Sequence, residues 1–241
     1  MKTYYNRPYC YRFVIVSTFI PYTVYMEYKF ASNIFYFTSI RSTNTYIHEN
    51  MELLPDRSIV IADQQLCGKG RYDREWVSSN TGNLYISFLL KGNSSLQSNI
   101  LHLTQFASVV LAISLETFLP RRHHCLIKWP NDVLVSQKKI GGILAESKWI
   151  GNSLKGVAIG MGVNLNMTRK EVLAIDQPAT SLNLIVKHSV DKHEFSKDLV
   201  FRFLESYNTF LCSGMVTFQD DLDRRLINKP EEDICSKGVL V

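Results

Sequence analysis

Two short apolar stretches, residues 126–134 and 140–147, lie on either side of the polar segment Ser136-Gln137-Lys138-Lys139. Apolar runs of this length that are bounded by turn residues are typical of strands, and a short polar connection is typical of a hairpin. Pro130 has no N–H for a strand ladder, so we expect a bend or bulge there. This pair of segments predicts an antiparallel hairpin, which is incompatible with a purely parallel sheet.

The rest of the chain has more predicted strands than predicted helices. Leu84, Ile86 and Phe88 alternate with other residues, as they would on one face of a strand. A helix is predicted where apolar residues recur every three or four positions, as they do before Pro120. We therefore predict an α+β fold, in which helices flank a mixed, largely antiparallel sheet. The further predicted strands are 35–40, 58–62, 83–90 and 156–165. The predicted helices are one that follows the polar turn Ser42-Thr43-Asn44 and runs through Tyr46 and Ile47 toward Leu54, one at 99–119 and one from Asp191 to Leu211.

Composition argues against several classes of protein. The formal net charge is +5, the basic residues are scattered, and no nucleic-acid recognition module is visible. The five cysteines include no C-x-x-C pair, which argues against a disulfide framework or a zinc site and favours the reducing cytoplasm. We expect no nucleic-acid partner and no membrane partner.

Residues 1–30 form an N-terminal extension of uncertain status. Basic residues precede an apolar stretch that reaches about Tyr25, which faintly resembles a signal peptide. Pro21 and several tyrosines interrupt this stretch, and it is short for a membrane span. We favour either a loosely docked extension or an upstream start codon, with Met26 as the functional initiator.

The first segment that could bind a ligand runs from Gly68 to Trp76. Its glycines allow backbone N–H groups to approach an anion closely, and Lys69, Arg71 and Arg74 add positive charge. Its spacing matches neither a Walker A loop nor a dinucleotide-binding fingerprint. From spacing alone, an anion-binding loop and a solvated basic turn are equally good interpretations.

Two further segments carry weaker signals. In residues 126–134, Lys128 lies between apolar neighbours, where burial is costly unless it meets an anion; alternatively it reaches solvent from an edge strand. In residues 159–165, Gly160 and Gly162 interrupt a strand, either for a ligand or for tight packing. Asn164 is either a polar ligand or a strand-end cap.

Together these segments resemble the biotin protein ligase family, in its form without a DNA-binding domain. The resemblance covers about residues 34–212, and its most specific part is Lys128-Trp129-Pro130-Asn131-Asp132 followed by Ile143-Leu144. It also includes Ser42-Thr43-Asn44, Gly68-Lys69-Gly70-Arg71, Asn83-Leu84-Tyr85, Lys139-Ile140-Gly141-Gly142 and Ile159-Gly160-Met161-Gly162-Val163-Asn164.

The resemblance implies a catalytic domain at 34–218, related to the class II aminoacyl-tRNA synthetase core. It implies ATP-dependent ligation of biotin to a lysine of a biotin carboxyl carrier domain through biotinyl-5′-AMP, with Mg²⁺ accompanying ATP. Lys128 and Arg71 are the expected catalytic residues. The residues expected to bind biotin or the adenylate are Ser42, Thr43, Asn44, Gln65, Gly68, Lys69, Gly70, Arg71, Trp76, Lys128, Asn131, Gly142, Gly160, Gly162 and Asn164.

This sequence departs from the family pattern at three positions of the basic loop. Lys69 replaces an arginine and so loses the two-pronged guanidinium, and Tyr72-Asp73 replaces a basic residue and a glycine. Residues 219–241 resemble a truncated start of a C-terminal SH3-like module. No winged-helix segment precedes the core, so repressor activity is not expected. We expect a monomer or weak homodimer.

Two alternatives remain. A lipoate or octanoate ligase has the same scaffold, but such enzymes show an arginine pair, a triple glycine and a histidine-aspartate motif that this chain lacks. A non-catalytic biotin-binding protein would be consistent with Lys69, Asp73 and the short C-terminal segment.

Overall fold

The computed structural model describes residues 33–78 and 80–227, and its described strands form one sheet in the order β1-β2-β3-β7-β6-β5-β4-β8. Two strand pairs at the sheet edges, β1–β2 and β4–β8, are parallel, and the other pairs are antiparallel. This confirms the predicted mixed, largely antiparallel sheet. The strands are β1 (Ile34–Ile40), β2 (Ile59–Gln65), β3 (Leu84–Lys91), β4 (Cys125–Lys128), β5 (Asp132–Val135), β6 (Lys138–Ile150), β7 (Ser153–Val163) and β8 (Leu226–Ile227).

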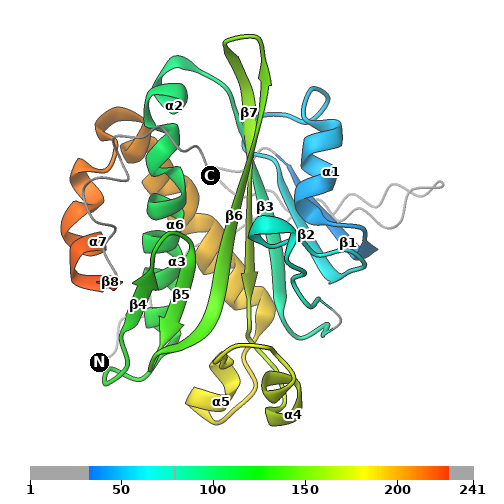
Figure 1. Ribbon diagram of the computed structural model, residues 1–241, viewed down its shortest axis with the longest axis vertical. Helices are drawn as coiled ribbons and strands as arrows, with labels where there is room; N and C mark the ends of the chain where they lie inside the picture. The colour runs from blue at the N-terminus through cyan, green and yellow to red at the C-terminus, as the bar shows by residue number, and fades with distance from the viewer. Residues whose placement is uncertain (1–32, 79, 228–241) are drawn as a thin grey trace, which may run out of the picture.

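Helices cover both faces of the sheet (Figure 1). The long helices α3 and α6 pack on one face, where Phe203 of α6 stacks on Phe88 of the sheet and Phe106 of α3 packs against Phe203. Helix α1 packs on the other face, where Ile47 and Met51 are buried. The helices are α1 (Thr43–Asn50), α2 (Ser94–Asn99), α3 (Leu103–Phe118), α4 (Arg169–Leu173), α5 (Leu182–Val186), α6 (Lys192–Ser213) and α7 (Gln219–Arg225), with 3₁₀ turns η1 (Arg71–Asp73), η2 (Ile100–His102) and η3 (Val216–Phe218).

Strand β3 has one face in the hydrophobic core and the other face against the N-terminus of α1. Leu84, Ile86 and Phe88 point into the core beneath α3 and α6, as their alternation predicted. Ser87 lies on the opposite face and reaches the side chains of Thr43 and Asn44 at the start of α1. One strand therefore contributes to the main core and also holds the N-terminus of α1.

One described helical segment, Ser94–Phe118, is long and apolar enough to cross a membrane by length and composition. More than half of its most apolar window, 56%, is buried inside the protein. It packs against α6 and the sheet, as the central helix of a globular core does.

The prediction of one strand at 126–134 was wrong. The segment forms two antiparallel strands, β4 and β5, and the reversal contains the cis peptide bond between Trp129 and Pro130. Pro130 has no N–H to continue the ladder, and Asn131 bonds across to strand β6. Its Nδ2 donates to the Ile143 carbonyl, and the Ile143 N–H donates to the Asn131 carbonyl, each at 2.9 Å.

The end of the described chain packs against the same core. Leu222 of α7 is buried, and β8 pairs with β4 so that Ile227 lies opposite Lys128. Arg225 of α7 pairs with Glu116 of α3 at 2.7 Å. The boundary that we predicted at residue 219 therefore does not coincide with a break in packing. The predicted N-terminal extension, and the SH3-like segment beyond residue 227, lie outside the described residues.

Candidate active site

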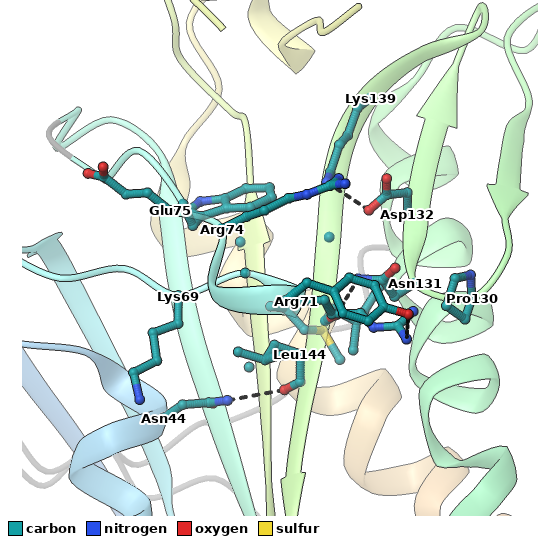
Figure 2. Close-up of a pocket in the computed structure, with 18 of the residues that line it drawn as sticks. Asn44, Lys69, Arg71, Arg74, Glu75, Pro130, Asn131, Asp132, Lys139 and Leu144 are labelled. Carbon is teal, nitrogen blue, oxygen red and sulfur yellow. Dashed lines mark hydrogen bonds and ion pairs between the residues drawn. The ribbon is translucent and has the colours of Figure 1, made fainter. Parts of the chain in front are cut away.

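A cavity of about 330 Å³ lies where α1, the loop 68–76 and strands β6 and β7 meet (Figure 2). Thirteen of the fifteen residues expected from the sequence to bind biotin or the adenylate line it. They are Ser42, Thr43, Asn44, Gln65, Lys69, Gly70, Arg71, Trp76, Lys128, Asn131, Gly142, Gly160 and Gly162.

The N-terminus of α1 forms one wall of the cavity. Ser42 caps the helix and accepts the Thr45 N–H at 3.4 Å. Thr43 donates its N–H and its hydroxyl to Gln65 Oε1, at 2.9 and 3.1 Å. The Gln65 amide in turn donates to Ser78 Oγ at 3.0 Å. Because both the oxygen and the nitrogen of the Gln65 amide are hydrogen-bonded, the start of α1 and the residues that follow the basic loop are held in a fixed position relative to each other.

Asn44 connects this wall to strand β6. It is almost fully buried, with 3% of its surface exposed, and its Nδ2 donates to the Leu144 carbonyl at 3.1 Å and to Glu146 Oε2 at 2.8 Å. Its Oδ1 accepts from Ser87 at 2.7 Å. A Cβ on Gly160 would lie 2.5 Å from that oxygen, so a glycine is needed there. Asn44 therefore has both amide hydrogens engaged and shapes the cavity wall.

The basic loop is a small hairpin. The Trp76 N–H donates to the Gly68 carbonyl at 2.9 Å, and the Gly70 N–H donates to the Arg74 carbonyl at 2.7 Å. Between these bonds Lys69 and Glu75 form an isolated antiparallel bridge. Gly68 does not line the cavity: a Cβ there would lie 2.4 Å from the Trp76 carbonyl oxygen, so this glycine allows the hairpin to close.

Trp76 forms the floor of the cavity together with two glycines. Its indole lies against Gly162 and Gly142, where an added Cβ would be 2.4 and 2.9 Å from ring atoms. Lys139 lies on the ring, with Nζ 5.1 Å from the ring centroid, and pairs with Asp132 at 2.7 Å. The two glycines give the indole a flat backbone surface on which to rest.

The cavity has an excess of positive charge. Five cations and two carboxylates line it, and the Asp132 carboxylate is already paired with Lys139. Lys128 is exposed at the end of β4, and its side chain makes no hydrogen bond or ion pair with residues 33–78 or 80–227. Figure 2 shows Lys139 and Asp132 at one end of the cavity, Asn44 and Lys69 at the other, and Arg71 between them. Such a surface suits an anionic ligand.

The structure places Asn164 away from this cavity. Its Nδ2 donates to the Thr180 carbonyl at 3.0 Å, and its own carbonyl accepts the Leu182 N–H. It therefore holds the segment that follows β7, which matches the alternative of a strand-end cap. That segment brings Gln177 to the cavity, a residue that no sequence signal had singled out.

Sequence reasoning also missed Lys139. The residue belongs to a segment that carried the resemblance, yet no role was assigned to it. The available signal was a lysine separated by one residue, Ile140, from the glycine pair Gly141-Gly142. The cavity is also lined by residues outside the fifteen expected to bind biotin or the adenylate: Tyr72, Arg74, Glu75, Trp129, Pro130, Asp132, Ile143, Leu144 and Met161.

The fold and the cavity together define a domain with a mixed sheet and an anion-binding pocket. The sequence profile described as "Biotin/lipoate A/B protein ligase family" matches residues 36–164, more than half of the chain. The chain belongs to this family.

The match covers only part of the length of each similar protein. The bifunctional ligase/repressor BirA of Bacillus subtilis is 28% identical over 184 residues, which are 76% of this chain and 56% of that protein. The biotin–[acetyl-CoA-carboxylase] ligase of Paracoccus denitrificans is 34% identical over 160 residues, 64% of each chain. The chain thus spans a little over half the length of the BirA proteins that it matches.

Solved structures show the same fold. The biotin protein ligase of Aquifex aeolicus in complex with biotin and ATP is 26% identical, with a TM-score of 0.68 over 81% of this chain and 79% of that chain. The ligase of Leishmania major in complex with biotinyl-5-AMP is 20% identical and supports the fold alone, with a TM-score of 0.65 over 83% of each chain.

Proposed function

We propose that this chain activates biotin with ATP and transfers it to a lysine of a biotin carboxyl carrier domain. The observation that carries the proposal is the cavity, in which a tryptophan and glycine floor lies beside an excess of cations. Family membership and the similarity to biotin ligases support the same function. In the first step a biotin carboxylate oxygen attacks the α-phosphorus of ATP, giving biotinyl-5′-AMP and releasing pyrophosphate.

The first step brings two anions together, so the site must neutralise charge and align the reactants. The Lys128 side chain lines the cavity without a partner among the described residues. It is therefore free to contact both a carboxylate oxygen of biotin and an α-phosphate oxygen of ATP. An electrostatic contact of this kind is worth about 3 kcal/mol in a transition state. Arg71, at the tip of the hairpin, contacts the adenylate and keeps the loop shut over it.

In the second step the neutral amine of the carrier lysine attacks the biotinyl carbonyl carbon. The amide bond forms, the carbon–oxygen bond to phosphate breaks and AMP leaves, while the nitrogen gives up one proton to the solvent. Closure of the hairpin protects the mixed anhydride from water. Replacing Arg71 with glycine should therefore release the adenylate early.

Mg²⁺ belongs to the proposal as a companion of the triphosphate. Within residues 33–78 and 80–227 no group of three His, Cys, Asp or Glu side chains is arranged to hold a metal ion. Of the two cavity carboxylates, Asp132 is engaged by Lys139. These residues do not form a resident metal site, so we assign no step to protein-bound metal.

The proposed partner is the carrier domain alone, without nucleic acid or membrane. We further propose a cytoplasmic location and a monomer or weak homodimer.

The test is ATP–pyrophosphate exchange by the purified protein, with biotin, with lipoate and with neither. Exchange that depends on biotin would establish the adenylating step. Exchange with lipoate alone would assign the chain to the lipoate branch of the family. Biotin binding without exchange would contradict the proposal and identify a non-catalytic biotin-binding protein.

A further inference from the structure

The tip of the basic hairpin lies between two cavities. The second cavity, of about 470 Å³, is lined on its far side by η2 and the start of α3, including Leu101 and Gln105. Arg71 and Tyr72 line both cavities. These two side chains therefore lie at the boundary between the two cavities.

Tyr72 has an unusual backbone for a residue with a side chain. Its φ of 56° and ψ of 43° are left-handed, which costs an L-residue other than glycine roughly 1–2 kcal/mol. The hairpin imposes this conformation, since the Gly70 N–H and the Arg74 carbonyl close the turn around it. The residue is 71% exposed, so burial in the core does not hold it.

The described contacts of the Tyr72 side chain are with Arg71. The Arg71 Nη2 donates to the Tyr72 hydroxyl at 3.2 Å, and the guanidinium carbon lies 4.9 Å from the ring centroid. A free arginine side chain has about 2 kcal/mol of rotamer entropy to lose on binding a phosphate. Stacking on the ring removes part of that freedom before the ligand arrives.

The contact with Tyr72 leaves Arg71 able to bind an anion. A guanidinium has five N–H donors, and the tyrosine hydroxyl uses one of them. The guanidinium carbon lies over the ring, and the donors that the hydroxyl does not use remain available to a phosphate. The two contacts are therefore compatible.

We propose that Tyr72 is a positioning residue that holds the Arg71 guanidinium at the boundary between the two cavities, so that the closed hairpin retains the adenylate. This inference rests on the proposed function.

The experiment measures the release of preformed, labelled biotinyl-5′-AMP after dilution. Tyr72→Ala should release it about two- to fivefold faster, the effect of losing one exposed cation–π contact. Tyr72→Phe, which keeps the ring, should restore most of the retention. Tyr72→Gly should behave like Tyr72→Ala. Glycine removes the strain of the left-handed backbone, but it does not replace the ring that contacts Arg71. Val77→Ala is the matched control, because Val77 is 57% exposed and lies outside both cavities.

The same substitutions in an Arg71→Ala background separate positioning from a general structural effect. Tyr72→Ala should have no further effect there, because the residue through which it acts is gone. Equal release by Tyr72→Ala and the wild type would overturn the inference, and so would an undiminished effect in the Arg71→Ala background. If the wild type itself fails to retain biotinyl-5′-AMP, the proposed function fails and the inference fails with it.

Discussion

The indole of Trp76 rests directly on the backbone of Gly162, and a Cβ at residue 162 would lie 2.4 Å from a ring carbon. The ring cannot bend away from such an atom, so a side chain at this position must move the whole indole. Because the indole forms the cavity floor, the packing of one glycine determines the shape of the binding site.

Gly162→Ala should therefore weaken biotin binding. Overpacking of this kind costs about 1–3 kcal/mol, which corresponds to a roughly five- to 150-fold higher Kd. Gly142→Ala, with a closest approach of 2.9 Å to the same ring, should have a smaller effect. Calorimetric titration with biotin measures both.

Gly156→Ala is the matched control, on the same strand but outside the cavity. Its Cβ would meet the Met51 sulfur at 2.8 Å and the Leu90 carbonyl oxygen at 2.9 Å, so stability should fall while the Kd for biotin is unchanged. Equal affinity of Gly162→Ala and the wild type would show that the floor does not contact biotin.

Asn44→Asp should disrupt the cavity wall. In the wild type, Glu146 Oε2 and the Leu144 carbonyl accept from Asn44 Nδ2 at 2.8 and 3.1 Å. The substitution places a carboxylate beside these two acceptors and removes their donor. Unpaired buried polar atoms cost about 1–3 kcal/mol, and the second negative charge adds repulsion. Urea denaturation should show the loss in the free energy of unfolding.

Adding Glu146→Gln to Asn44→Asp should recover much of that loss, because the new amide donates to the new carboxylate. Glu146→Gln alone should be mild, since Gln keeps an oxygen that accepts from Asn44. A double variant no more stable than Asn44→Asp would mean that this contact contributes little to the wall.

Local patterns were sufficient to predict some elements from the sequence. The alternation in β3 and the three- to four-residue spacing in α3 depend on residues close together in the chain. The reversal at Pro130 was underestimated as a bend, because whether a proline ends a strand depends on the partner strand. The parallel pairs β1–β2 and β4–β8 depend on chain paths that no local pattern encodes.

The cavity residues also fall into those that the sequence indicated and those whose place depends on contacts between distant parts of the chain. Most of the expected residues line the cavity because they lie in segments that the fold brings together. Asn164 does not, since an asparagine at a strand end looks the same in sequence whether it meets a ligand or the Thr180 carbonyl. Lys139 was missed because its position over Trp76 joins residues 63 positions apart in the chain.

Lys128→Ala should reduce biotin-dependent pyrophosphate exchange about 100-fold, the effect of losing roughly 3 kcal/mol of transition-state stabilisation. Its free energy of unfolding should be unchanged, since Lys128 is exposed and unpaired within the described part of the chain. Lys139→Ala should lower both activity and stability, because it leaves Asp132 without its partner at 2.7 Å.

Lys148→Ala is the matched control on the same strand as Lys139. Lys148 pairs with Glu52 at 3.6 Å and lies outside both cavities, so exchange should persist. If Lys128→Ala exchanges pyrophosphate as fast as this control, Lys128 does not contact the reacting anions.

The cysteines provide a prediction about pH. Burial, together with the nearby Glu116 carboxylate, raises the pKa of the Cys125 thiol to about 12, against the opposing effect of Arg225. The thiolate is the reactive form, so Cys125 should resist iodoacetamide at pH 8 until the protein unfolds. Cys67 and Cys212 are exposed and should be alkylated in the native state. Peptide mass spectrometry distinguishes the three positions.

The same raised pKa determines how stability depends on pH. A thiol whose pKa is raised by folding stabilises the native state fully below its ordinary value of 9.0, and this contribution is lost as the pH rises toward about 12. The free energy of unfolding should therefore fall above about pH 9 and fall less in Cys125→Ala. Tyr85, whose pKa burial raises from 10.0 to about 12, adds its own loss above pH 10 in both proteins. Identical slopes for the two proteins between pH 8 and 10 would show that Cys125 ionises as readily when folded as when unfolded.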